Sequence, residues 1–100
     1  MAIGAIKDAR AVNPLDVGLI LTEANLYIQL GDKKKFVDLM KEAIDKDPNN
    51  HILYFNLGVI TAEQGDRNKA RSYYENAIEL DPNDEDAKIN YELLKKFISQ

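Results

Sequence analysis

Apolar residues recur at helical spacing along the whole chain. Between residues 67 and 80, Ala70, Tyr73, Tyr74, Ala77 and Ile78 follow one another at intervals of three, one, three and one. This spacing places them on one face of a helix. Similar stripes in other segments predict an all-α fold, with helices at residues 17–30, 33–46, 51–64, 67–80 and 84–98.

Short polar breaks separate the predicted helices. Gly31 and Gly65 can adopt the left-handed conformation that ends a helix. Asp32 and Asp66 follow them directly, and a short carboxylate at that position can cap the next helix. Each glycine–aspartate pair therefore predicts a tight turn between two helices.

The three prolines divide the chain at equal intervals. Pro14, Pro48 and Pro82 recur with a 34-residue period, which is that of one class of helix-turn-helix repeat. The predicted organisation is a partial repeat or N-terminal helix at 1–14, a divergent repeat at 15–48, a second repeat at 49–82 and a C-terminal capping helix at 83–100.

The second unit carries a characteristic set of residues at fixed spacing. Its pattern resembles the tetratricopeptide repeat (TPR), in which W-x2-L-G-x2-Y is followed by A-x3-F and by a closing proline. Tyr54 stands in the place of the tryptophan and Thr61 in the place of the tyrosine. The matching positions are Tyr54, Leu57, Gly58, Thr61, Ala70, Tyr74, Ala77 and Pro82.

The first unit resembles the same family less closely. Glu23 replaces the leucine of the pattern, and Phe36 replaces a small alanine. An unpaired buried carboxylate is costly, so Glu23 is expected to reach the surface or find a partner. The positions that do fit are Ile20, Ala24, Tyr27, Met40, Ala43 and Pro48.

The resemblance implies an α-solenoid of antiparallel helix hairpins closed by the C-terminal helix. It also implies a non-enzymatic protein–protein interaction module that holds a peptide segment of a partner in a concave groove. Two alternatives remain open, namely a homo-oligomerisation module and a structural segment of a longer solenoid. The residues expected to line the groove are Leu21, Asn25, Ile28, Ile52, Phe55, Asn56, Val59, Glu63, Ile89, Asn90, Leu93 and Phe97.

One subclass of the family does not fit. Repeats that hold the C-terminal tails of chaperones clamp a carboxylate with two asparagines and three cations. Asn25 and Asn56 occupy the asparagine places, but Leu21, Asp86 and Asn90 stand in the places of the cations. A chaperone tail of the carboxylate-clamp type is therefore not expected as a partner.

Composition narrows the possible partners further. The 100 residues carry a net charge of −4, and nucleic acids or anionic membranes require a basic surface. There is no cysteine, and no apolar run is long enough to insert into a membrane. Neither a targeting segment nor a membrane segment is evident, so localisation stays undetermined, with the cytoplasm as the default.

Candidate chemistry is sparse. His51 is the single histidine and is expected to be a surface or capping residue, so neither catalytic nor metal-binding residues are predicted. No phosphate-binding loop or nucleophile–base arrangement appears, and no cofactor is expected. Lys33, Lys34 and Lys35 point in different directions around a helix and are expected to be solvated.

Overall fold

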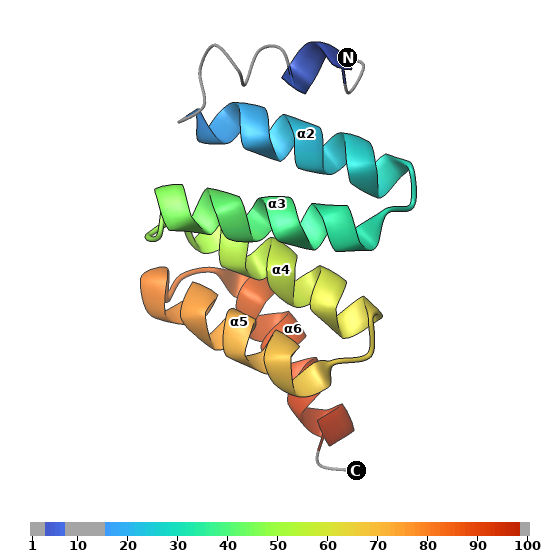
Figure 1. Ribbon diagram of the computed structural model, residues 1–100. Coiled ribbons are helices and arrows are strands. Elements are labelled where there is room, and N and C mark those ends of the chain that lie inside the picture. Colours follow the sequence, from blue (N-terminus) through green and yellow to red (C-terminus); the bar gives the residue numbers. More distant parts are fainter. Residues whose placement is uncertain (1–3, 8–15, 99–100) are drawn as a thin grey trace. The chain divides into compact units, whose positions relative to one another are not determined.

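The computed structural model describes residues 4–7 and 16–98, and Figure 1 shows them as a series of helices. No strand occurs in these two ranges, so the predicted all-α fold is confirmed. The helix ends fall within one residue of the predicted ones. The helices are α2 (Val17–Gln29), α3 (Lys33–Lys46), α4 (His51–Glu63), α5 (Arg67–Leu80) and α6 (Glu85–Ile98).

Only part of the expected N-terminal element is described. Residues 4–7 are helical, and Ile6 is fully buried. The rest of the partial repeat predicted at 1–14 lies outside the described residues. The assignment of the chain to four repeat elements therefore stays a prediction.

The turns within the two hairpins use the same local chemistry. Asp32 accepts a hydrogen bond from the Lys35 N–H at 3.1 Å, and Asp66 accepts one from the Lys69 N–H at 3.2 Å. These carboxylates satisfy first-turn amides that have no partner within their helix. The preceding glycines, at φ 81° for Gly31 and 92° for Gly65, occupy the left-handed region predicted for them.

The chain forms two compact units, Met1–Pro48 and Asn49–Gln100. In the first unit, α2 packs against α3. Glu23 is buried in α2, and it makes a polar interaction, as its position required. Phe36 is buried at the start of α3. The buried apolar residues of the two helices are Ile20, Ala24, Phe36, Leu39, Met40 and Ala43.

The second unit joins α4, α5 and α6. Its central cluster consists of Ala70 and Tyr74 from α5 and Leu94 from α6. Phe55 packs against this cluster from α4, with its ring centroid 6.0 Å from that of Tyr74 and the two planes tilted by 50°. Such tilted aromatic contacts stabilise a core beyond simple area burial. The α6 helix therefore shares one core with the preceding hairpin.

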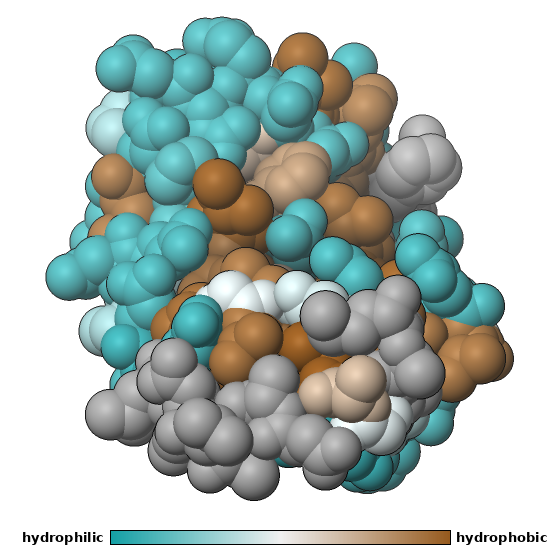
Figure 2. Space-filling view, turned by 90° about the horizontal axis from the view of Figure 1, so that it is seen from above, coloured by the Kyte–Doolittle hydropathy of each residue, from teal (hydrophilic) through white to brown (hydrophobic). Residues whose placement is uncertain are grey.

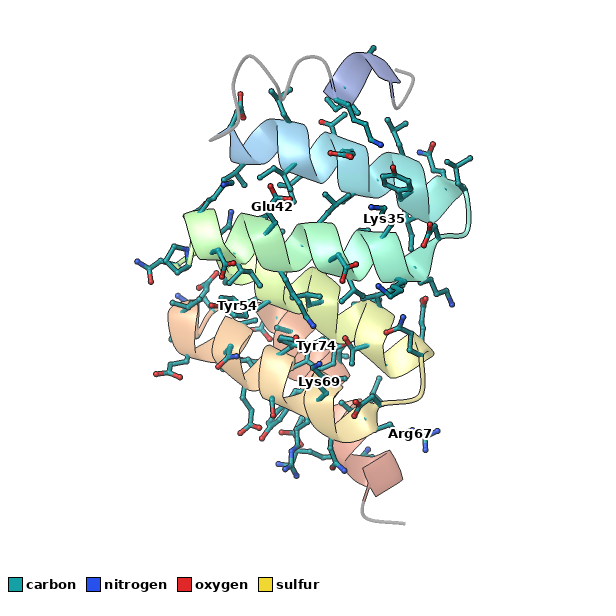
Figure 3. All side chains as sticks on the ribbon, in the orientation of Figure 1. Lys35, Glu42, Tyr54, Arg67, Lys69 and Tyr74 are labelled. Carbon is teal, nitrogen blue, oxygen red and sulfur yellow. The ribbon has the colours of Figure 1, made fainter. Side chains whose placement is uncertain are left out.

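Close approach of α4 and α5 depends on Gly58. A Cβ atom at this position would lie 2.6 Å from Cε1 and 2.8 Å from Cδ1 of Tyr74, which is closer than side-chain atoms pack. The ring of Tyr74, which Figure 3 labels, therefore fills the space that a side chain at Gly58 would need. This contact explains why a glycine occurs at position 58 within α4, although glycine lowers the stability of a helix.

His51 has a structural role that was not predicted from the sequence. Its Nδ1 lies 3.1 Å from Asp84 Oδ2, and its Nε2 lies 3.4 Å from Asp81 Oδ2. Asp84 also caps α6 by accepting a hydrogen bond from the Ala87 N–H at 3.1 Å. The first residue of α4 thereby contacts both ends of the turn between α5 and α6.

Substitution of Gly58 by alanine should destabilise the second unit. The Tyr74 ring must shift to admit the methyl group, which costs about 1–3 kcal/mol, while better helix propensity returns at most about 1 kcal/mol. Chemical denaturation should therefore show a lower free energy of unfolding. In a Tyr74→Leu background the penalty should shrink or change sign. An equal penalty in both backgrounds would show that the Tyr74 contact is not its cause.

The His51 contacts should be measurable as a coupling energy. His51→Ala and Asp84→Ala should each lower the free energy of unfolding, with Asp84→Ala costing about 1 kcal/mol more because it also removes a helix cap. The double variant should cost less than the sum of the two single variants. Asn76→Ala, at an exposed position of α5, is the matched control and should be nearly neutral. Strict additivity would mean that the two side chains do not interact.

Tyr74 should make the stability depend on alkaline pH. Burial, and secondly the negative charge of Glu63, raise the pKa of its phenol above the ordinary value of 10.0. The folded state thus holds the proton more tightly than the unfolded state, so this stability is present below about pH 10 and lost as pH rises through the raised pKa. Tyr74→Phe should lose less stability than wild type above about pH 10. Parallel stability curves for the two proteins would refute the assignment.

Candidate functional site

The residues predicted to line a groove all lie on α2, α4 and α6. None of the eleven whose side chains are described belongs to the buried core. The Phe97 side chain lies outside the described residues. The exposed members are Asn25, Ile52, Glu63, Ile89 and Leu93, and the half-buried ones are Leu21, Ile28, Phe55, Asn56, Val59 and Asn90.

The second unit brings residues of α4 and α6 together. Phe55 and Val59 pack against the cluster that contains Leu94 of α6. Asn56 is half-buried beside them in sequence, and Asn90 is its equivalent on α6 after a shift of one repeat. Phe55 therefore has a structural role in addition to the binding role predicted for it.

Several large apolar side chains reach the surface of this unit. Ile52 is 53% exposed on α4, and Ile89 and Leu93 are 57% and 49% exposed on α6. Figure 2 shows a different view, the molecule seen from above, and hydrophobic residues lie among hydrophilic ones at that surface too. Exposed apolar surface often marks a binding site when it is contiguous, so these three side chains are candidates for contact with a partner.

The first unit contributes three predicted residues, all on α2. Leu21, Asn25 and Ile28 are separated by four and three positions, so at about 100° per residue they share one face of the helix. Asn25 is exposed, and the other two are half-buried. The α2 face thus repeats the combination of apolar side chains and asparagine found in the second unit.

The charged side chains at the end of α4 and in the first turn of α6 are acidic. Glu63 is exposed at the end of α4 and contributes to the raised pKa of Tyr74, after burial as the larger cause. Asp86 is exposed in the first turn of α6. The candidate set contains no lysine or arginine. An anionic ligand would therefore find no cation among these residues.

The described residues contain no group of three or more histidine, cysteine, aspartate or glutamate side chains placed to hold a metal ion. The His51 contacts fit this finding, because each ring nitrogen faces a different carboxylate.

Over the ranges that the structure describes, no helix has both the length and the apolar character needed to cross a membrane.

The His51 contacts had a detectable signal in the sequence. His51 begins one repeat, and Asp84 stands just before the equivalent position of the next repeat. Equivalent positions of successive repeats are neighbours in a stacked array. A pairing of residues at this separation could therefore have been anticipated.

Two stretches of the chain match the tetratricopeptide repeat. One match covers residues 51–84 and a second covers residues 19–50. The curated proteins contain no match to this sequence.

Three solved structures with a similar fold are compared with the chain. The first TPR of Spaghetti (RPAP3), bound to the HSP90 peptide SRMEEVD, has a TM-score of 0.87 and 17% identity, covering 98% of this chain and 78% of that one. TTC0263, a thermophilic TPR protein of Thermus thermophilus, has a TM-score of 0.82 and 27% identity, covering 93% of this chain and 47% of that one. MamA (AMB-1) has a TM-score of 0.81 and 20% identity, covering 97% of this chain and 53% of that one.

The chain thus spans about half the length of the last two proteins. Both of its repeat units carry the family signature, and the observed helices follow the same period. The chain therefore belongs to the tetratricopeptide repeat family.

Proposed function

We propose that this chain is a protein-interaction module that binds an extended peptide segment of a partner protein, without catalysis. The observation that carries the proposal is found in each unit taken by itself: apolar side chains and asparagines are exposed or half-buried on α2 in the first unit, and on α4 and α6 in the second. The fully buried residues of these helices are other residues, so packing of the core does not explain the exposed side chains.

The asparagines are suited to hold a peptide backbone. A side-chain amide offers both donors and an acceptor, so it can pair with an N–H and a C=O of an extended chain. Asn25, Asn56 and Asn90 occupy such positions on three successive first helices of the repeats. Recognition of this kind depends little on the partner's side chains, so it fits a partner segment defined mainly by its extended conformation.

The apolar residues add contact area beside the asparagines. Ile52 and Val59 on α4, together with Leu21 and Ile28 on α2, present aliphatic side chains that are not fully buried. Because these side chains are few, we expect a dissociation constant in the micromolar range or weaker, equivalent to about −8 kcal/mol or less in magnitude.

The chemistry of the surface argues against an acidic chaperone tail as the partner. The Spaghetti repeat was solved with the HSP90 peptide SRMEEVD, but its identity to this chain is only 17%. Leu21, Asp86 and Asn90 stand where a carboxylate clamp would need cations. An exposed acid such as Asp86 would repel an anionic peptide rather than hold it.

A peptide selected on this chain from a random display library provides the test. Binding measured by fluorescence anisotropy should weaken about fivefold in Asn56→Ala, since one hydrogen-bonding amide is lost. Asn76→Ala, at an exposed position of α5, should bind as wild type does. The peptide SRMEEVD should not compete.

Amide chemical shifts provide a second readout of the same experiment. Addition of the selected peptide should perturb α2, α4 and α6 more than α3 and α5. Perturbations confined to α3 and α5, or unchanged affinity in Asn56→Ala, would show that the peptide binds elsewhere.

A further inference from the structure

One stripe of α6 combines exposed apolar side chains with charges of opposite sign at its two ends. Ile89 and Leu93 are 57% and 49% exposed, and Asp86 and Lys96 are exposed as well. The four residues are separated by three, four and three positions, which confines them to an arc of about 80°. Ala87 and Leu94 are buried on a different side of the helix.

The residues of this stripe are arranged symmetrically along the helix. From either end, a charged residue is followed by two apolar residues and then by a residue of the opposite charge. Asp86 and Lys96 lie five positions before and after Tyr91, and Ile89 and Leu93 lie two positions before and after it. In an antiparallel pair of α6 helices related by a two-fold axis that crosses the stripe midway between Ile89 and Leu93, each acid faces a base and each apolar residue faces another. We propose that a second copy of this chain docks on α6 in this way.

The two end charges are available for such a pairing. Other charges of α6 interact within the helix, with Lys88 3.9 Å from Glu85 and Lys95 3.7 Å from Glu92. Lys95 also lies 5.0 Å from the centre of the Tyr91 ring. Asp86 and Lys96, in contrast, form no hydrogen bond or ion pair with any residue that the structure describes.

The equivalent stripe of α4 packs against another helix, which supports a helix as the partner of the α6 stripe. Ile89 and Leu93 correspond to Phe55 and Val59 after a shift of one repeat. On α4 these two residues pack against the cluster that includes Leu94 of the following helix, α6. On α6 the same positions hold apolar side chains but remain about half exposed.

The residues around the stripe favour a second copy over a further repeat packed in the same manner. Lys96 replaces Ala62, which packs against the apolar cluster of the second unit. Glu92 replaces Gly58, whose lack of a side chain admits the Tyr74 ring. A charged rim disfavours burial under another hairpin, whereas it can pair across an isologous two-fold contact.

The proposed contact is small. A helix of 14 residues is about 21 Å long, and each copy contributes only two apolar residues, so the association should be weak and dependent on salt. The dimer would cover Ile89 and Leu93, which are also among the residues predicted to line the groove. It does not depend on the proposed peptide binding.

The proposal can be tested by sedimentation equilibrium of the full 100-residue chain and of variants in which the charge of Asp86 or Lys96 is reversed. Wild type should shift from the 11.3 kDa monomer toward twice that mass between about 10 μM and about 1 mM. Asp86→Lys and Lys96→Asp should each raise the dimer dissociation constant about tenfold or more, because each places like charges opposite one another twice. An equimolar mixture of the two variants should restore association, since opposite charges then meet at both ends.

Matched variants distinguish this interface from a general effect of net charge. Lys41→Asp, at an exposed position of α3, alters the net charge as Lys96→Asp does and should leave the dimer intact. Asn56→Ala should also leave it intact. A wild-type chain that stays monomeric at about 1 mM would overturn the proposal. So would single variants that dimerise like wild type, or a mixture that fails to associate while circular dichroism shows both variants folded.

Discussion

The second unit depends above all on the close contact of two helices at Gly58 and Tyr74. The absence of a Cβ at Gly58 lets the ring lie against the α4 backbone, and the ring in turn supports Phe55 and Leu94. Three helices thereby share one aromatic anchor. Because protein interiors are closely packed, even a single added methyl group at this point must displace its neighbours.

The helices could be predicted almost to the residue, because their ends are determined by local chemistry. Gly31 and Gly65 adopt positive φ, and Asp32 and Asp66 cap the next helix, each through interactions close by along the chain. The partners of His51 do not follow from such local chemistry. Its two carboxylate partners lie about one repeat away along the chain, so their contact forms only when successive repeat elements pack.

The groove assignment itself stays a prediction, and the sequence does not determine the surroundings of its residues. A 34-residue period identifies which positions of α4 and α6 are equivalent, and the candidate residues described on them are exposed or half-buried. Equivalence in sequence does not imply equal surroundings, however. Phe55 packs against the cluster of Ala70, Tyr74 and Leu94, whereas Ile89 is more than half exposed. The reason is that α4, but not α6, is followed by further helices in the described structure.

The attachment of α6 also suggests the order in which the chain loses structure. Among the residues of α6 with described side chains, only Ala87 and Leu94 are buried, while its start is held by the His51–Asp84 contact. Regions with few buried apolar side chains open at lower free energy than the rest of a protein. We therefore expect the backbone amides of α6 to exchange in deuterated water before those of α4 and α5. Simultaneous exchange of all three helices would instead show that they unfold as one.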